Sequence, residues 1–470
     1  MDLNKQPITK TFTSYPLWLV IGLFFIIISP TFLTDGMFMD GLYYATISKN
    51  MSEQFGTFWA PEFTDTHSWG NGHPPLALYL QSLFYHFGNS VFIAKLYSLL
   101  TQICCGFIMY GIWKELGMKC RHFWFVLLLW MLIPLMFWAS TNNLLENTMA
   151  IFTLLSVLFY LKSRKKHRFI FLCCTGLMVF LAFMTKGFTG IYPLAFPFIY
   201  WLCRCNISLK KMAMDSFTIV LVSAIPMAVL LLFYPPAKSF FADYFSNQIL
   251  NSIQNVQTVD SRFFIVIRFF KEIITPLVAV GIICLIALRQ KVFKNSFSTI
   301  PQKTAAAFLL LTLCGVFPIM ISLKQNGFYI LTVFPIFAIG LGIFTESFLN
   351  NIRISEKIQI FFKITSVVVL LAAISANVFY AGKIGRDEKL LTDIYYLLPN
   401  IPEHTTIEVE ESMSENYSAQ AYLYFLKKIS IVTKQEHEFF LCEGDHEPEG
   451  PYVLYKKAPN DFKLYRKVTE

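Results

Sequence analysis

Several ionisable residues lie beside long apolar stretches, where a charge is unfavourable unless it serves a function. They are Asp40, His73, Glu146, Lys186, Arg262, Arg268 and Lys324. A carboxylate can accept the proton of an incoming hydroxyl group. Cations can stabilise a departing phosphate. Together these residue types suit the transfer of a group from a phosphate to a hydroxyl.

This chemistry divides the candidates by role. Asp40 and Glu146 are the expected catalytic carboxylates. The expected phosphate ligands are His73, Lys186, Lys324 and Arg262, and the expected substrate contacts are Tyr43, Tyr44 and Tyr329. Each residue also has a structural interpretation. The carboxylates suit helix N-termini, the lysines can extend to the membrane interface, and the tyrosines suit an aromatic belt.

The elements that position these residues belong to a membrane protein. The 470 residues are 55% hydrophobic, 49 of them are Phe, and only 15% are charged, against roughly 25% in soluble domains. Such a chain needs lipid as part of its solvent. The net charge of +9 does not indicate nucleic-acid binding, because the Lys and Arg residues lie between apolar runs, as a topology signal does.

Eleven segments are long and apolar enough to be candidate membrane-spanning helices. They are 16–33, 89–112, 122–140, 144–161, 169–185, 188–203, 215–234, 269–288, 305–323, 327–345 and 361–381. Lys and Arg concentrate in alternate loops, such as 162–168 and 289–294. This bias predicts a cytoplasmic N-terminus and, with an odd number of spans, an extracytoplasmic C-terminus. The first span is expected to remain uncleaved, since no small-residue cleavage site follows it.

Three polar segments are then expected outside the membrane: 34–88, 235–268 and 382–470. In the first, Met39, Tyr43, Ile47, Met51 and Phe55 recur every fourth residue, which predicts an amphipathic helix lying flat on the outer membrane face. Asp40, Tyr44 and Ser48 are expected beside this apolar stripe.

The last segment is long enough to fold by itself. Its pattern predicts helices at 389–398 and 419–428 and strands at 406–410, 429–433, 452–456 and 462–468. We therefore predict two domains. Residues 1–381 form a polytopic α-helical membrane domain that includes the outer loop 34–88, and residues 382–470 form a small α/β domain.

The remaining motifs exclude other chemistry. There is no phosphate-binding P-loop, GxGxxG or DxD motif, so nothing indicates a nucleotide-driven reaction. Nine of the ten Cys residues lie in or beside apolar segments and only Cys442 lies in a polar region, which predicts neither a disulfide framework nor a metal site. No cofactor is expected. An outward-facing enzyme without nucleotide needs an activated substrate in the membrane, such as a lipid-linked phosphosugar.

Four pieces of sequence carry a resemblance to a known family. MDGLYYATISKNM (39–51), WGNGHPPLALYLQSLFYHFG (69–88), MTKGFTGIYPL (184–194) and SLKQNGFYILTVFPIFA (322–338) resemble, in this order, the GT-C superfamily of membrane glycosyltransferases. They look closest to the branch of aminoarabinose transferases, protein O-mannosyltransferases and lipopolysaccharide-core transferases. The resemblance covers about residues 15–345.

The resemblance implies a role for several of these positions. In the family, an Asp that opens the flat first-loop helix acts as the base, and this Asp corresponds to Asp40. A second acidic residue at the outer start of the fourth helix corresponds to Glu146. The residue before Pro-Pro contacts the donor phosphate and is His73 here, where the aminoarabinose branch has Lys; the Lys of TKG is Lys186. The family often has Asp-Glu where this chain has Asp40-Gly41, and it more commonly has Asp at the position of Glu146.

The function expected on this basis is inverting transfer of a sugar from a polyprenyl-phosphate donor to an acceptor hydroxyl on the extracytoplasmic face. The acceptor is a glycolipid, a glycan or a protein, and the location is the bacterial inner membrane. Two alternatives stay open. A lipid or sugar transporter, or flippase, would show inverted repeats and midplane charges. A non-catalytic membrane scaffold would use none of these residues for chemistry.

Overall fold

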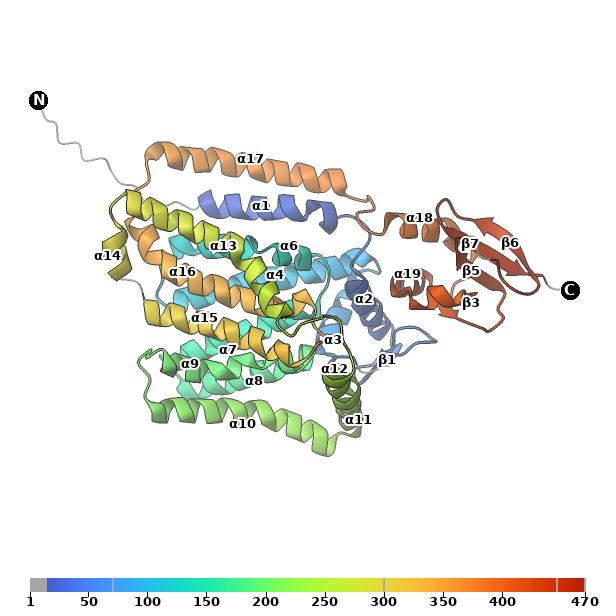
Figure 1. The fold of residues 1–470 in the computed structure, drawn as a ribbon, viewed down its shortest axis with the longest axis horizontal. Helices are drawn as coiled ribbons and strands as arrows, with labels where there is room; N and C mark the ends of the chain where they lie inside the picture. The colour runs from blue at the N-terminus through green and yellow to red at the C-terminus, as the bar shows by residue number, and fades with distance from the viewer. Residues whose placement is uncertain (1–14, 70–71, 299–300, 445–446, 469–470) are drawn as a thin grey trace, which may run out of the picture.

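The computed structural model describes residues 15–69, 72–298, 301–444 and 447–468. A bundle of roughly parallel and antiparallel helices carries a small α/β domain at one end (Figure 1). The first helix begins at the opposite end of the bundle, and the last long helix ends beside the domain. The expected fold class, a polytopic helical protein with a small sheet domain near its C-terminus, is confirmed.

Within the described residues, nine helical segments are long and apolar enough to cross a membrane. They are α1 (Tyr15–Phe32), α4 (Val91–Glu115), α7 (Leu145–Ser163), α8 (Arg168–Lys186), α10 (Leu209–Phe233), α13 (Phe264–Arg289), α15 (Gln302–Val316) continued by η6 (Phe317–Ile321), η7 (Gly327–Val333) continued by α16 (Phe334–Asn351), and α17 (Glu356–Tyr380). Each coincides with a span expected from the sequence.

The other two expected spans take different forms. Segment 122–140 is broken into α5 (Phe123–Met131) and α6 (Pro134–Ser140), bent by 86°, and counts as a tenth span only if the pair is taken together. Pro134 has no backbone N–H to continue the first helix, and the N–H of Leu135 is satisfied by Glu272 Oε2 at 2.9 Å. Segment 188–203 forms the shorter helix Phe188–Leu202, built from η3 (Phe188–Gly190), η4 (Tyr192–Ala195) and α9 (Phe196–Leu202).

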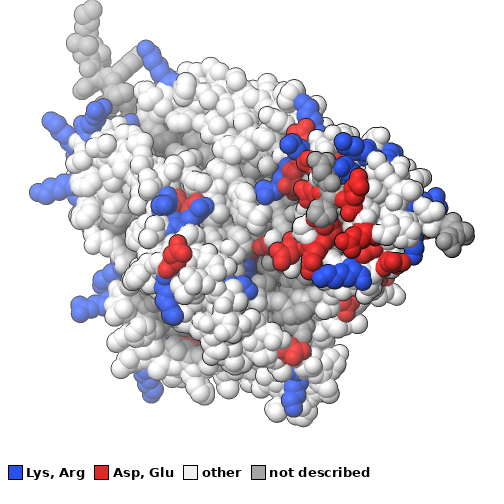
Figure 2. All heavy atoms as spheres, turned by 45° about the vertical axis from the view of Figure 1, so that its right-hand side comes forward, with Lys and Arg blue, Asp and Glu red and all other residues white. Residues whose placement is uncertain are grey.

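The spanning helices differ widely in how far the protein covers them. Of the apolar window of each helix, 83% is buried for Gly327–Asn351 and 72% for α7, but only 6% for α10 and 11% for α17. The two least covered helices therefore border the lipid, α17 packed on α1 and α10 packed on α8. A mostly uncharged belt separates a basic rim from the charged α/β domain (Figure 2).

The two outer loops form compact structure at the domain end of the bundle. The first contains α2 (Met39–Ser52), the short strands β1 (Gly56–Thr57) and β2 (Ala60–Pro61), α3 (Leu76–Ser82) and η1 (Leu83–Phe87). The second contains α11 (Pro235–Asp243), the π-helix η5 (Tyr244–Leu250) and α12 (Asn251–Gln254). At the opposite end, η2 (Cys120–His122) precedes α5, and α14 (Phe293–Ser298) follows α13.

The expected amphipathic helix exists, but its surroundings correct the prediction. Helix α2 ends at Ser52, before Phe55, and does not lie bare on the membrane face. Most of its residues are buried, including Tyr44 and Ser48 outside the apolar stripe, because α3 packs on one side and a helix of the α/β domain on another. Tertiary contacts thus replace the lipid that the sequence pattern suggested.

The α/β domain contains α18 (Glu388–Leu397), η8 (Leu398–Asn400), β3 (Thr406–Val409), η9 (Glu411–Glu415), α19 (Tyr417–Lys427), β4 (Ser430–Val432), β5 (Phe439–Glu443), β6 (Tyr452–Lys457) and β7 (Phe462–Lys467). The sheet order is β4-β3-β5-β7-β6, with β3 parallel to both neighbours and β7 antiparallel to both of its own. All expected elements are present, and β5 is additional.

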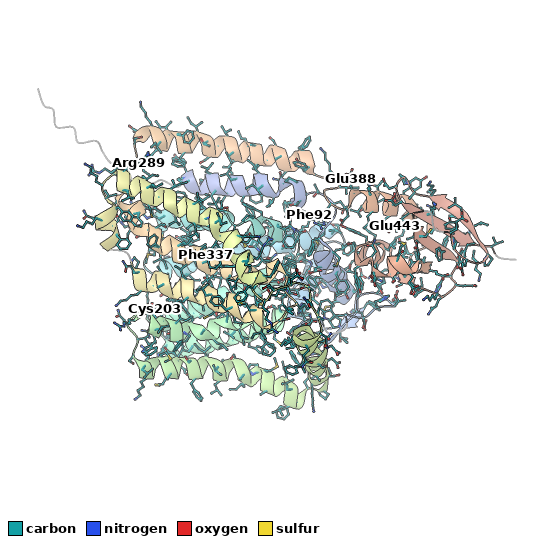
Figure 3. All side chains as sticks on the ribbon, in the orientation of Figure 1. Phe92, Cys203, Arg289, Phe337, Glu388 and Glu443 are labelled. Carbon is teal, nitrogen blue, oxygen red and sulfur yellow. The ribbon has the colours of Figure 1, made fainter. Side chains whose placement is uncertain are left out.

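The domain docks onto the first loop rather than hanging free. Tyr422 of α19 accepts a hydrogen bond from the backbone N–H of Met37 at 2.9 Å, and Lys49 of α2 donates to the carbonyl of Phe425 at 2.7 Å. Lys428 pairs with Glu53 at 2.6 Å. Glu388 and Glu443 mark this domain in Figure 3, at the opposite end from Cys203 and Arg289. The domain therefore supports the helix that carries Asp40.

Candidate active site

The start of α2 is held by the turn between α6 and α7. The N–H of Phe38 donates to Asn142 Oδ1 at 3.1 Å, and Asn143 Nδ2 donates to the carbonyl of Gly41 at 2.9 Å. The backbone carbonyl of Asn142 approaches Gly41 so closely that a Cβ atom at position 41 would overlap it. Packing therefore excludes a carboxylate side chain at position 41, directly after Asp40 in the chain. Asp40 is positioned in the first turn of α2, half-buried.

Glu146 and Lys186 form a buried ion pair across two neighbouring helices. Glu146 lies in the first turn of α7 and Lys186 at the last position of α8, and Nζ of Lys186 donates to Oε1 of Glu146. Their side chains are 0% and 3% exposed. Oε2 of Glu146 is also buried, and no described residue donates to it. Burying such a pair is costly, because both charges lose their hydration. The pair is therefore a candidate for a role in the reaction as well as in stability.

The surroundings of Lys186 explain the local sequence. Gly187 ends α8 with a φ of +83°, and Tyr244 of η5 packs where its Cβ would be, so glycine is required on both counts. The ammonium of Lys186 also lies over the ring of Tyr329, 4.6 Å from its centroid, and 5.1 Å from that of Phe328. These rings, together with Glu146, limit the freedom of the ammonium.

Asp40 lies within the fields of two cations. Burial raises the pKa of its carboxyl group, while the charges of Lys186 and Lys324 oppose the rise. Lys324, in the turn before η7, is half-buried, and its Nζ donates to Gln248 Oε1 of η5 at 3.2 Å. Burial and the charge of Lys186 lower the pKa of Lys324, and Asp40 raises it. Asp40, Glu146, Lys186 and Lys324 therefore form one charged cluster.

Two of the expected tyrosines join this cluster and one does not. Tyr329 stacks against Lys186, and burial followed by the charges of Asp40 and Glu146 raises the pKa of Tyr44. Tyr43 lies instead among the aromatic residues of the first loop, with its ring centroid 4.0 Å from that of Phe63 and 5.5 Å from that of Trp69.

His73 faces the same cations but carries no charge of its own. Its Nδ1 atom is buried without a described hydrogen-bond partner, and its carbonyl accepts a hydrogen bond from Trp69 Nε1 at 3.4 Å. Burial, with the charges of Lys186 and Lys324, lowers the pKa of the imidazole well below its usual value. His73 is therefore neutral at physiological pH and can offer a hydrogen bond, but not a positive charge.

The arginines lie at the edge of the site. Arg262 is exposed and donates to the carbonyl of Ile321 at 2.9 Å, and Arg268 pairs with Glu272 at 2.6 Å. Gln325 ties the turn of Lys324 to the same region, donating to the carbonyl of Arg262 at 3.0 Å and accepting from the N–H of Ile265 at 2.9 Å. Through these hydrogen bonds Arg262 stabilises the turn that carries Lys324.

Sequence reasoning missed the neutral polar residues around the cluster. Gln81 of α3 accepts hydrogen bonds from Ser48 at 3.0 Å and from Asn143 at 3.2 Å, while its Nε2 is buried with no described partner. Gln248 was also missed. The Thr-Asn-Asn run at 141–143, at the end of an apolar segment and just before Glu146, was a usable signal. Among the described residues, no three His, Cys, Asp or Glu side chains are grouped as a metal ion would require.

Comparisons with known proteins support the fold. Residues 72–232 match the family model described as dolichyl-phosphate-mannose-protein mannosyltransferase. The whole fold is similar to ArnT from Cupriavidus metallidurans in the apo state, with a TM-score of 0.63 and 14% identity over 96% of this chain and 97% of that one. A second structure of that protein, bound to undecaprenyl phosphate, gives a TM-score of 0.59 and 13% identity over the same shares. No curated protein sequence matches the chain.

The similarity extends over nearly the full length of both chains, so the loops and the α/β domain are included as well as the bundle. The chain has the fold of the GT-C membrane glycosyltransferases, and the resemblance carried by the four sequence motifs is confirmed.

Proposed function

We propose that this protein transfers a sugar from a polyprenyl-phosphate donor to the hydroxyl group of an acceptor, with inversion at the anomeric carbon. The observation that carries the proposal is the half-buried Asp40 carboxyl group in the fields of Lys186 and Lys324. A base and two cations in one site are what this displacement requires. The undecaprenyl phosphate bound to the similar ArnT supports a donor of this kind.

In the proposed reaction, the acceptor oxygen attacks the anomeric carbon and the bond from that carbon to the phosphate oxygen breaks. Asp40 takes the proton from the hydroxyl group. Lys186 and Lys324 stabilise the charge that develops on the departing phosphate, and His73 donates a hydrogen bond. Glu146 holds Lys186 in place, while Tyr44 and Tyr329 line the site. The acceptor is a glycolipid, a glycan or a protein.

The proposed setting is the bacterial inner membrane. Residues 1–381 would form the catalytic membrane domain with the N-terminus in the cytoplasm, and residues 382–470 would lie outside. The concentration of Lys and Arg in alternate loops supports this orientation. A reporter that works only outside the cytoplasm should be active when it is fused after Lys383. Activity there of a reporter that works only in the cytoplasm would contradict this orientation.

The test of the function is a reaction in detergent, where no gradient exists. The purified protein is incubated with polyprenyl-phosphate-linked sugars, including mannose and 4-amino-4-deoxyarabinose, and with acceptors from a membrane extract. Release of polyprenyl phosphate together with a labelled product is expected, and Asp40→Asn should lower it at least about a hundredfold. A transporter or a scaffold would release no polyprenyl phosphate from any of these donors.

A further inference from the structure

The break between α5 and α6 leaves an apolar recess in the side of the bundle. It has a volume of about 680 Å³ and is lined by α1, η2, α4, α5 and α6. Its walls include Phe24 of α1, Gly106 of α4, and Trp124 and Trp130 of α5. Because α6 turns away by 86° after α5, it cannot continue along the groove as a straight helix would.

The recess lies apart from the charged cluster. None of the described residues that line it belongs to α2, α7, α8 or η7, which hold Asp40, Glu146, Lys186 and Tyr329. On α1 it uses residues near the beginning of the helix, from Leu17, and on α4 it runs toward the end, to Tyr110. It therefore reaches the end of the bundle opposite the α/β domain, where α1 begins and α4 ends, and which the loop charges predict to be cytoplasmic.

The described lining of the recess is largely apolar and includes one cation. Of the described residues that line it, Arg121 is the only one with a charged side chain. Arg121 donates from Nε to the ring of His122 at 3.2 Å and from Nη2 to Asn350 at 3.4 Å. Lys114 and Lys119 are exposed close by in the chain. An apolar slot with a cation at the membrane interface is complementary to a lipid with an anionic headgroup.

We propose that the recess binds an acidic phospholipid of the leaflet opposite the α/β domain, with one acyl chain between α1 and α5 and the phosphate at Arg121. The acyl chain fills apolar volume that the broken helix leaves open. The guanidinium of Arg121 suits a phosphate, because its donors match two phosphate oxygens at once. In the proposed reaction the phosphate of the polyprenyl donor lies at Lys186 and Lys324, on other helices, so the occupant of the recess is a different lipid.

Gly106 allows a direct test, because it can be enlarged into the recess. A Cβ atom at this position meets only Leu127, at 3.9 Å, so Gly106→Leu fills the recess without a backbone clash. Gly281→Leu is the matched control, since Gly281 also lies within a spanning helix, and a Cβ there has nothing within 4 Å. Neither residue belongs to the charged cluster.

The measurement is native mass spectrometry with phosphatidylglycerol or phosphatidylcholine, combined with a photoreactive acyl-chain probe mapped by peptide analysis. We expect wild type and Gly281→Leu to retain one phosphatidylglycerol and to crosslink within residues 102–131. Gly106→Leu should weaken this binding at least tenfold and lose these crosslinks. Retention of both by Gly106→Leu would overturn the proposal.

The headgroup is tested with Arg121→Gln, and Arg353→Gln serves as the control because Arg353 is an exposed arginine at the same end of the bundle. Arg121→Gln should keep the acyl-chain crosslinks but lose the preference for phosphatidylglycerol, whereas Arg353→Gln should keep both. Equal binding of the two lipids by wild type would contradict an acidic ligand. Displacement of the bound lipid by polyprenyl phosphate would show that the recess belongs to the donor instead.

Discussion

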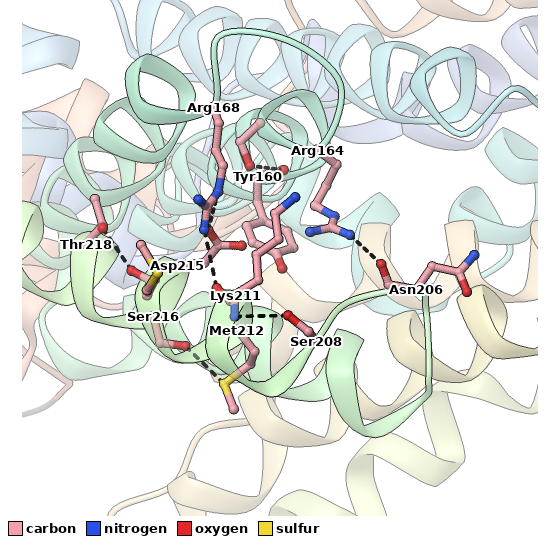
Figure 4. Close-up of polar contacts among 12 residues, drawn as sticks. Tyr160, Arg164, Arg168, Asn206, Ser208, Lys211, Met212, Asp215, Ser216 and Thr218 are labelled. Atoms are coloured by element: carbon pink, nitrogen blue, oxygen red, sulfur yellow. Dashed lines mark hydrogen bonds and ion pairs between the residues drawn. The ribbon is translucent and has the colours of Figure 1, made fainter.

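Helix α8 carries a cation at each end, and the two ends differ in what surrounds the resulting ion pair. At its beginning, Arg168 donates to Asp215 Oδ1 from Nε at 2.9 Å and from Nη2 at 2.5 Å (Figure 4). At its end, Lys186 pairs with Glu146. In both pairs the second carboxylate oxygen is buried without a described partner. The geometry of the two pairs alone therefore does not show which pair is structural and which belongs to the reaction site.

The neighbours of each pair make the distinction. Asp215 is one of only two buried residues of α10, a helix that otherwise faces lipid, and its partner Arg168 is 36% exposed. This pair fastens a peripheral helix to the bundle. The pair at the other end is almost fully enclosed and shares its surroundings with Asp40 and Lys324. A buried pair with further charges around it is the better candidate for catalysis.

The sharpest test of this comparison is Asp40→Asn. The amide keeps the size of the side chain but cannot take a proton, so turnover should fall at least about a hundredfold, while folding and donor binding persist. Turnover and donor binding are measured on the purified variant. Glu146→Gln is the comparator and should lose less, because Glu146 positions Lys186. A larger loss for Glu146→Gln would mean that Glu146, and not Asp40, is the base.

Lys186→Met should follow, with a loss of turnover of about tenfold or more because a charge-assisted contact to phosphate disappears. It should also lower the free energy of unfolding by about 3–5 kcal/mol, since Glu146 is left as a buried, unpaired charge. The double variant Lys186→Met/Glu146→Gln separates the two effects. We expect stability to recover and turnover to stay low; recovery of both would make the pair purely structural.

Lys324→Met should change the pH dependence of the reaction. Asp40 works as a carboxylate, so activity falls as the pH drops through its pKa, which burial raises. The charge of Lys324 opposes that rise, and its removal should move the acid limb of kcat/KM to higher pH. Lys324→Arg, which keeps the charge, should leave the limb in place. If the acid limb does not move in Lys324→Met, the charge of Lys324 does not influence the pKa of Asp40.

The smallest effect on turnover is expected at the beginning of α8. Arg168→Gln removes charged hydrogen bonds to Asp215 and should lower the free energy of unfolding by about 1.5–3 kcal/mol. Because the pair touches no residue of the charged cluster, turnover of the folded protein should stay within about twofold of wild type. Unfolding in detergent and turnover are measured on the same preparation. A tenfold loss of turnover would mean that the two ends of α8 are coupled.

Local patterns accounted for most elements of the fold. Long apolar runs predicted the spanning helices, because backbone groups in lipid must be satisfied within one helix. The predicted span 122–140 is broken at Pro134, and the second half of this segment depends on Glu272 of α13 as the acceptor for the N–H of Leu135. Strand β5 was missed because its residues, Phe439 to Glu443, do not alternate between apolar and polar types.

The candidate residues were chosen from the sequence by charge beside apolar runs, and that reasoning reached Asp40, Glu146, Lys186 and Lys324. It could not separate these from Arg262, which lies at the edge of the site, or from Tyr43, which packs among the aromatic residues of the first loop. It also could not find Gln81 or Gln248, because a neutral amide carries no signal until the fold gives it partners: Ser48 and Asn143 for Gln81, and Lys324 for Gln248.

The sequence by itself determined that the chain is a polytopic membrane protein and which end of the bundle concentrates candidate acids and bases. These follow from transfer free energies, which each segment carries independently of its neighbours. Only the tertiary structure decided that Glu146 pairs with Lys186 and that burial lowers the pKa of His73. It also decided that the backbone carbonyl of Asn142 occupies the space of a side chain at position 41. Such properties depend on burial and on close approach between segments distant in the chain, which no local pattern encodes.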